Sequence, residues 1–130
     1  MRIAHVEMVT HDVDGTVNFY TAVLGFKMKL TQRIHLSSLG VPIDIGYLQG
    51  GESAVELISY EDGAIAPAPA GEQLGYRMMT IEVEDVNKAV AYLRAKGGEN
   101  SWESRAFDNR YAGAEMRDPN GYRIELRQWF

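Results

Sequence analysis

HVEMVTHDVDGTVNFYTAVLG, residues 5–25, is repeated in outline by MMTIEVEDVNKAVAYLRAKGG, residues 78–98. A shift of 73 positions superimposes the two stretches, and a shift of 69 positions superimposes Val55-Glu56-Leu57 on Ile124-Glu125-Leu126. A duplication of this kind predicts two copies of one supersecondary unit. The aligned pairs within the first match are Asp12-Val13 with Asp85-Val86, Phe19 with Tyr92, and Gly25 with Gly98.

The first copy has the pattern of one strand, one helix and three strands. Residues 2–9 are short and rich in apolar and β-branched types, which is typical of a strand. Asp12 can cap a helix that runs to about Leu24, and Gly25 supplies its stop. Turn-forming residues then separate three further predicted strands, at 26–33, 43–48 and 54–60.

The second copy follows a segment without usable periodicity, residues 61–73, which we expect to be an extended linker. Asp85 caps the second helix, and Asp118-Pro119-Asn120-Gly121 predicts a hairpin before a last strand at 122–128. The expected organisation is therefore a single domain over 1–130, made of a first module (1–60), the linker (61–73) and a second module (74–130).

The composition excludes several classes of function. The formal net charge is -5 and no cluster of Lys and Arg is visible, so nucleic acid is not an expected partner. The absence of cysteine excludes disulfides, thiolate nucleophiles and iron-sulfur clusters. The amino terminus lacks the apolar core of a signal peptide, and no apolar run approaches the roughly 20 residues that span a bilayer. We expect a cytoplasmic protein without membrane association.

The order and spacing of these motifs resemble the vicinal oxygen chelate superfamily, which includes glyoxalase I, bleomycin resistance proteins and extradiol dioxygenases. The resemblance implies an α+β fold in which two tandem βαβββ modules form a cupped mixed sheet around a central cavity. It covers nearly the whole chain. The segments that carry it are His5, Asp12-Val13-Asp14, Asn18-Phe19-Tyr20, Val23-Leu24-Gly25-Phe26, Val55-Glu56-Leu57, Val83-Glu84-Asp85-Val86, residues 93–98 and residues 118–126.

The layout is most similar to that of bacterial glyoxalase I, whose four metal positions fall on His5, Glu56, Met78 and Glu125. The family pattern has His at the third position, where this chain has Met78. The resemblance therefore implies three metal ligands, His5, Glu56 and Glu125. It also implies a homodimer, because the cup in such relatives closes either within one chain or across two.

One histidine nitrogen and two glutamate oxygens favour a divalent Mn, Fe, Co, Ni or Zn ion. A thioether is a poor ligand for these ions, so Met78 predicts an open or hydrophobic position rather than a sulfur ligand. Glu7 lies two residues after His5 and shares its strand face, which makes it an alternative ligand or base that the family pattern does not include. His11 and His35 lie in predicted loops, and we assign no functional role to them.

The leading hypothesis is a glyoxalase-like metal-dependent lyase or isomerase acting on a small oxygenated substrate. The ion would stabilise an enediolate, and by resemblance Glu125 or Glu56 would carry the proton. The sequence does not indicate which of these two glutamates carries the proton. The loops at 34–42 and 100–112 would determine the substrate specificity.

Two alternatives remain open from the sequence. Met78 favours a metal-free binding protein of the bleomycin resistance type, which would enclose an aromatic drug or metabolite. An extradiol dioxygenase ranks below it, because such iron sites use two His and one carboxylate and the second His is missing. Aromatic residues that could line the cavity or a dimer seam are Trp102, Phe107, Tyr111, Trp129 and Phe130.

Overall fold

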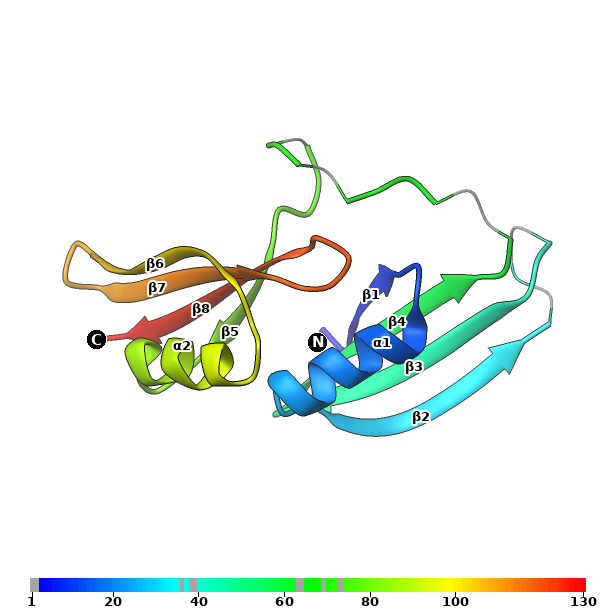
Figure 1. Cartoon of the computed structure of the whole chain (residues 1–130), viewed down its shortest axis with the longest axis horizontal. Helices are drawn as coiled ribbons and strands as arrows, with labels where there is room; N and C mark the ends of the chain where they lie inside the picture. The colour runs from blue at the N-terminus through cyan, green and yellow to red at the C-terminus, as the bar shows by residue number, and fades with distance from the viewer. Residues whose placement is uncertain (1–2, 36, 38–39, 63–64, 69, 73) are drawn as a thin grey trace. The chain divides into compact units, whose positions relative to one another are not determined.

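The computed structural model describes residues 3–35, 37, 40–62, 65–68, 70–72 and 74–130. Contacts within the chain divide it into two units, Met1–Ala66 and Pro67–Phe130. Each unit contains one four-stranded mixed sheet with a helix against it (Figure 1). The fold is therefore α+β and consists of two βαβββ units, as the duplication predicts. Among the described residues, no helix is long and apolar enough to cross a bilayer.

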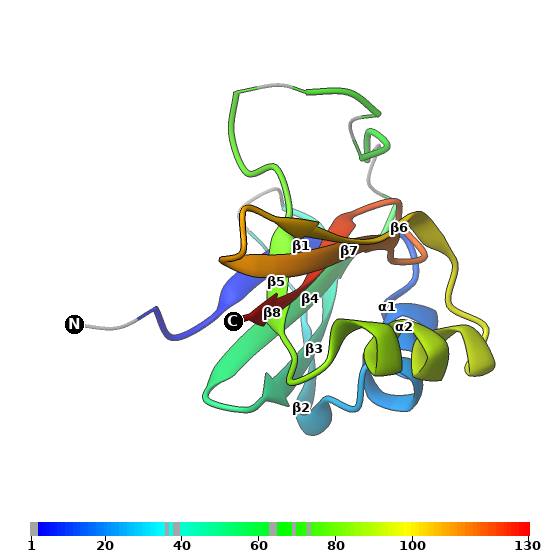
Figure 2. The ribbon, with the colours of Figure 1, turned by 90° about the vertical axis from the view of Figure 1, so that its left-hand side faces the viewer.

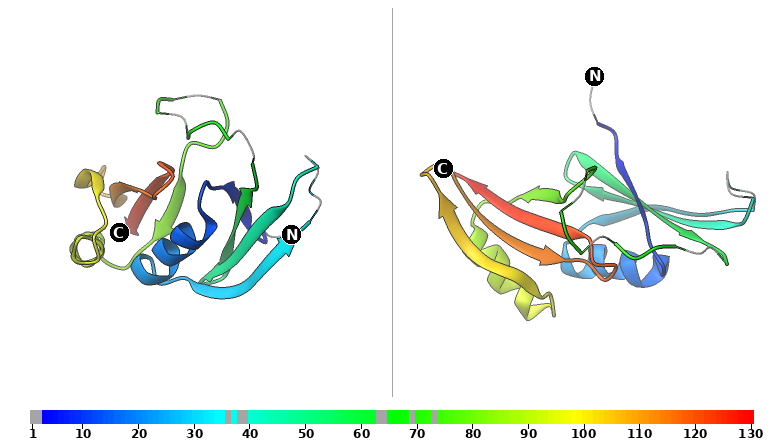
Figure 3. Two further views of the ribbon diagram at one scale, coloured as in Figure 1. Left: turned by 45° about the vertical axis from the view of Figure 1, so that its right-hand side comes forward. Right: turned by 90° about the horizontal axis from the view of Figure 1, so that it is seen from above.

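In the first unit, the strand order is β1-β4-β3-β2. β1 runs parallel to β4, whereas the other two pairings are antiparallel. The helical segment crosses one face of this sheet, as the left-hand panel of Figure 3 shows. The elements are β1 (Val6–Val9), α1 (Val13–Asn18), η1 (Phe19–Val23), β2 (Lys27–Ile34), β3 (Ile43–Gly50) and β4 (Ser53–Tyr60).

The second unit repeats this arrangement with the order β5-β8-β7-β6, and α2 lies against one face of its sheet (Figure 2). Val6 pairs with Val55 in the first unit, and Met79 pairs with Ile124 in the second. These pairs differ by the same shifts, 73 and 69, that relate the two copies in the sequence. The elements are β5 (Met79–Glu82), α2 (Val86–Ala95), β6 (Asn100–Phe107), β7 (Tyr111–Arg117) and β8 (Arg123–Trp129).

The predicted helix caps and the last hairpin are confirmed. Asp12 accepts a hydrogen bond from the Gly15 amide, and Asp85 accepts hydrogen bonds from the amides of the second and third residues after it. Asp118 closes the last hairpin by accepting from the Asn120 and Tyr122 amides, while Gly121 adopts a φ of 87°.

Some predicted boundaries differ from the structure. The first strand was predicted over residues 2–9 but begins at Val6, so His5 lies just before it, and residues 1–2 lie outside the described part. Likewise, β5 begins at Met79, one residue after Met78. The first helix changes from α to π geometry at Phe19, which the apolar spacing does not encode. The described residues of the predicted linker form no helix or strand, and its positions 63, 64, 69 and 73 lie outside them.

Each sheet packs apolar side chains under its own helix, and in the first unit a second buried cluster of Ile43, Ile45 and Ile58 lies on the opposite face. In the first unit, α1 packs closely on the sheet at Gly46, where a Cβ would lie 2.6 Å from the Val17 side chain. In the second unit, the Val86 amide at the start of α2 donates to Gln128 of β8. Residues alternate along a strand, so these contacts identify the helix-covered face of each sheet. Buried side chains on these faces include Leu48, Val55, Leu57, Ala114, Met116, Ile124 and Leu126.

Gly50→Ala should destabilise the protein by about 1–3 kcal/mol, because an added methyl group must displace a packed ring. A Cβ at Gly50 would lie 2.6 Å from Cζ of Phe26. Urea denaturation would measure the change, with Gly71→Ala as the control, since a Cβ there would have no heavy atom within 4 Å. Equal midpoints for the two variants would contradict this packing.

A buried ion pair lies on the face of the second sheet opposite α2. The Glu115 side chain is 2% exposed and accepts from Nη2 and Nε of Arg123 at 2.6 and 3.0 Å. Burial alone would raise the pKa of Glu115. The hydrogen bonds from Arg123 and Trp102 outweigh it and hold the pKa below its ordinary value of 4.5. The ionised form of Glu115 therefore stabilises the folded state.

Glu115→Gln should lower the free energy of unfolding by about 1–3 kcal/mol near neutral pH, because Arg123 loses its charged partner. A carboxylate with a lowered folded pKa stabilises fully above its unfolded pKa and loses that effect as the pH falls through its folded pKa. The difference between wild type and variant should therefore shrink below about pH 4.5. Urea titrations at several pH values would test this, and a difference that is constant down to pH 2 would contradict it.

Candidate metal centre

His5 and Glu56 come together because β1 and β4 are parallel neighbours. His5 Nε2 lies 3.1 Å from Glu56 Oε2, with the side chains 37% and 19% exposed. The His5 ring also meets the Tyr47 ring edge-on, with centroids 5.5 Å apart. Tyr47 pairs with Glu56 across β3 and β4, so all three side chains share the sheet face opposite α1. The two first-unit residues predicted as ligands are therefore adjacent and accessible.

Glu7 joins this pair. It pairs in register with Glu56, and its carboxylate lies on the same face. The potential ligand atoms of His5, Glu7 and Glu56 all lie within 4.8 Å of one another. An imidazole nitrogen and two carboxylates suit a divalent Mn, Fe, Co, Ni or Zn ion, so the donor chemistry of this cluster fits the metal implied by the sequence.

Glu125 has different surroundings in the second unit. Its side chain is 7% exposed, and Thr80 Oγ1 donates to its Oε2 at 2.9 Å. Arg127 Nη2 reaches both carboxylate oxygens, at 2.9 and 2.8 Å. Gly113, which pairs with Arg127 across β7 and β8, leaves room for the carboxylate, because a Cβ there would lie 3.1 Å from Glu125 Oε1. Glu125 is thus a buried carboxylate that is already neutralised by an arginine.

Arg127 is held by aromatic rings as well as by Glu125. Its guanidinium carbon lies 4.2 Å from the Tyr111 ring centroid and 5.1 Å from that of Trp129. Its Nε is buried and has no hydrogen-bond partner among the described residues. The sequence reasoning missed Arg127 and Thr80. Arg127 follows Glu125 by two residues on the same strand face, and that spacing was the available signal.

Four of the five aromatic residues singled out in the sequence, all but Phe130, form a row on this face. Phe107 stacks on Tyr111 with centroids 4.9 Å apart, and Tyr111 meets Trp129 edge-on. Trp102 meets Phe107 edge-on at 6.3 Å, and Arg105 lies over both of these rings. The right-hand panel of Figure 3 shows β6, β7 and β8 side by side, which is the arrangement that aligns these rings.

Met78 lies partly buried before β5, as His5 lies before β1. Its sulfur accepts from Nη1 of Arg77 at 3.4 Å. Arg77 also pairs with Glu72, which in turn bonds Arg123. The hydrogen bonds from Arg77 and then Arg123 lower the pKa of Glu72 to about 2. Met78 therefore has an arginine as its polar neighbour.

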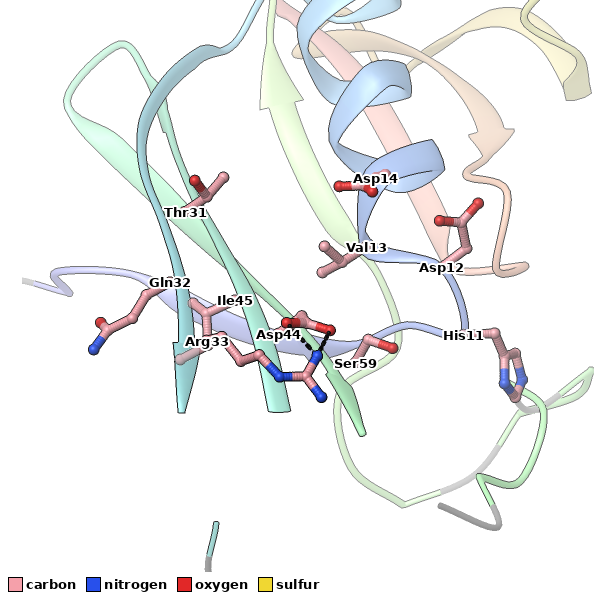
Figure 4. Close-up of a pocket in the computed structure, with 10 residues that line it drawn as sticks. All are labelled: His11, Asp12, Val13, Asp14, Thr31, Gln32, Arg33, Asp44, Ile45 and Ser59. Atoms are coloured by element: carbon pink, nitrogen blue, oxygen red, sulfur yellow. Dashed lines mark hydrogen bonds and ion pairs between the residues drawn. The ribbon is translucent and has the colours of Figure 1, made fainter. Parts of the chain in front are cut away.

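Two hollows lie away from the His5 cluster. One of about 480 Å³ lies between the start of α1 and the sheet of the first unit. In Figure 4, Arg33 pairs with Asp44 at this hollow, while His11, Asp12 and Asp14 lie near the start of the helix. A second hollow, of about 300 Å³, is lined by Tyr76, Arg77, Glu72 and Arg123, among others, in the second unit. Neither hollow includes His5, Glu7 or Glu56.

Comparisons with known proteins identify the family. Residues 2–126 match the model of the Glyoxalase/Bleomycin resistance protein/Dioxygenase superfamily. A lactoylglutathione lyase of Escherichia coli O157:H7 is 28% identical over 127 residues, which are 97% of this chain and 91% of that protein. A probable chloroplastic lactoylglutathione lyase of Arabidopsis thaliana is 32% identical over 126 residues, 96% of this chain. The chain spans 35% of the length of that plant protein and 44% of a second plant lyase.

Solved structures agree on the fold. A glyoxalase family protein from Bacillus cereus superimposes with a TM-score of 0.84 at 24% identity, covering all of this chain and 95% of the other. The trypanothione-dependent glyoxalase I of Leishmania major superimposes with a TM-score of 0.74 at 25% identity, covering 98% of this chain and 86% of that one. Together with the two matched βαβββ units, these findings show that the chain belongs to the Glyoxalase/Bleomycin resistance protein/Dioxygenase superfamily.

Proposed function

We propose that this protein is a metal-dependent lyase or isomerase that acts on a small oxygenated substrate, such as an α-hydroxycarbonyl compound or a thioester. The observation that carries the proposal is the contact between His5 Nε2 and Glu56 Oε2 on an accessible sheet face. Both residues fall on metal positions of the glyoxalase I pattern. The similarity to lactoylglutathione lyases supports the same class of reaction.

The proposed ligands are His5, Glu56 and Glu125, and the bound ion is Mn, Fe, Co, Ni or Zn. When bound, such an ion supplies Lewis acidity that stabilises the negative charge of an enediolate. His5 offers Nε2, and Glu56 offers a carboxylate that is 19% exposed. Arg127 donates hydrogen bonds to both oxygens of Glu125. At least one of these hydrogen bonds must break before Glu125 can bind the ion or accept a proton.

Glu125 is our proposed proton carrier, with Glu56 as the alternative. In a buried setting, a carboxylate that changes partner can accept a proton from the substrate and return it. Arg127 and Thr80 hold Glu125 in one orientation, which limits the positions that its oxygens can take. We also propose that the protein is a cytoplasmic homodimer, in which a second copy of the chain could complete the site.

A second candidate function is the metal-free binding of an aromatic drug or metabolite. The observation that favours it is the pairing of Glu125 with Arg127 beside the row formed by Phe107, Tyr111 and Trp129. Stacked rings and an arginine are typical of a surface that binds a flat, polar ligand. Under this alternative, Glu125 would keep Arg127 in place and would take no part in chemistry.

Elemental analysis and a turnover assay with lactoylglutathione would separate the two functions. The wild type, reconstituted with Ni²⁺ or Zn²⁺, should hold about one ion per chain and should exchange the lactoyl α-proton with deuterated water. His5→Ala and Glu56→Gln should lose the ion. Glu125→Gln should exchange the proton about 10²–10⁴-fold more slowly, because it lacks the proton carrier.

Glu99→Gln removes an exposed charge from the same unit and is the matched control for Glu125→Gln. It should leave metal content and exchange unchanged. A wild-type protein that takes up no ion, yet binds a flat aromatic dye through Arg127, would refute the metal-dependent function and support the second candidate. A metal-loaded protein that catalyses no exchange of this thioester would exclude lactoylglutathione as a substrate.

A further inference from the structure

We propose that Glu7, in place of Glu125, is the third protein ligand of the divalent ion at His5 and Glu56, so that three residues of the first unit hold the ion by themselves. This role for Glu7 rests on the proposed function, because it concerns the same ion. The family pattern includes no ligand at this position. The assignment therefore comes from the arrangement of the side chains in this chain.

The geometry places Glu7 where a ligand is needed. Parallel pairing puts Glu7 directly beside Glu56, and His5 precedes Glu7 by two residues on the same face. The ligand atoms of the three residues lie within 4.8 Å of one another, so one ion could contact all of them after small side-chain rotations. The two strands thus supply one nitrogen and two carboxylates from a single sheet face.

The charges point to a cation. Two carboxylates at paired strand positions repel each other. Within the described residues of the first unit, neither Glu7 nor Glu56 forms a salt bridge with an arginine or lysine, and His5 is the partner of Glu56. A bound divalent cation would compensate both negative charges.

In the second unit, the same fold satisfies two paired carboxylates, Glu115 and Glu125, without a metal, because Arg123 and Arg127 pair with them. Under the duplication, Thr80 stands where Glu7 stands, and it pairs in register with Glu125. Thr80 donates a hydrogen bond to Glu125, and Arg127 neutralises its charge. The first unit has Glu7 in place of that hydroxyl donor and Ile58 in place of that arginine. The second unit therefore balances its carboxylates with arginines, whereas the described residues of the first unit place no arginine or lysine in a salt bridge with Glu7 or Glu56.

Glu7 also explains how the ion is held with Met78 at the expected histidine position. His5, Glu7 and Glu56 give three ligands, which is the number that catalytic sites use while they leave a position open for substrate. Glu125 can then stay with Arg127 or carry a proton while the ion remains in place. Binding of the ion should depend on Glu7 much more than on Glu125.

Calorimetric titration of the metal-free full chain with Zn²⁺ alone would test this role. Glu7→Gln should weaken Zn²⁺ binding by about tenfold or more, since even the outer partners of metal ligands are worth about 10–100-fold. Glu52→Gln, an exposed acid at the β3–β4 turn, is the matched control and should bind as the wild type does. Glu125→Gln should stay within a few-fold of the wild type.

Thermal unfolding separates a ligand from a structural residue. Metal-free Glu7→Gln and Glu7→Thr should be at least as stable as the metal-free wild type, because both relieve the repulsion from Glu56. Threonine also reproduces the residue at the equivalent position of the second unit. Both variants should lose most of the stabilisation that Zn²⁺ gives to the wild type.

The outcomes distinguish this role from the proposed function. If the wild type binds Zn²⁺ and Glu56→Gln does not, but Glu7→Gln binds as tightly as wild type, Glu7 is not a ligand and the metal-dependent function stands. A loss in Glu125→Gln as large as that in Glu7→Gln would overturn the claim that the first unit holds the ion by itself. If the wild type binds no Zn²⁺, Mn²⁺ or Ni²⁺, both proposals fall.

Discussion

The parallel pairing of β1 with β4 is the constraint on which the candidate site depends. β1 and β4 are far apart in the sequence, and their register places Glu7 beside Glu56 and brings His5 within 3.1 Å of it. A shift of one residue in this pairing would turn the glutamates to opposite faces of the sheet, because side chains alternate along a strand. The helix-covered face fixes the register, since Val55 and Leu57 must lie under the helix.

The same pairing recurs in the second unit with different chemistry. β5 and β8 place Thr80 beside Glu125, and Arg127 completes the charge balance there. One backbone arrangement therefore carries an acidic cluster in one unit and a neutralised carboxylate in the other. In our account, the first site holds the ion and the second keeps a proton carrier in a defined orientation. Duplication supplied two equivalent positions, and the side chains have since diverged in role.

Much of the fold can be predicted from the sequence, because it is encoded locally. The caps at Asp12 and Asp85 and the hairpin at Asp118 follow from short side-chain to backbone hydrogen bonds, which neighbouring residues determine. The repeat itself predicts the equivalence of Glu56 and Glu125. The π turn at Phe19 and the late start of β1 escaped prediction, because they depend on packing against the rest of the unit.

The environment of each glutamate was harder to predict than its position. The pairing of Arg127 with Glu125, and its stacking on Tyr111, depends on rotamers and on β7 lying beside β8. The sequence reasoning missed Arg127, and its spacing of two residues from Glu125 would predict a shared face but not this contact. Glu7 was recognisable as a neighbour of His5, but its closeness to Glu56 requires the strand register. The ligand set is therefore a property of the folded sheet.

A crystal structure of the full chain grown with Zn²⁺, with anomalous diffraction measured at the zinc edge, tests the central claim most directly. The account predicts one strong anomalous peak about 2.0–2.2 Å from His5 Nε2 and from a carboxylate oxygen of Glu56. A strong peak at another group of residues, with His5 still hydrogen-bonded to Glu56, would contradict it.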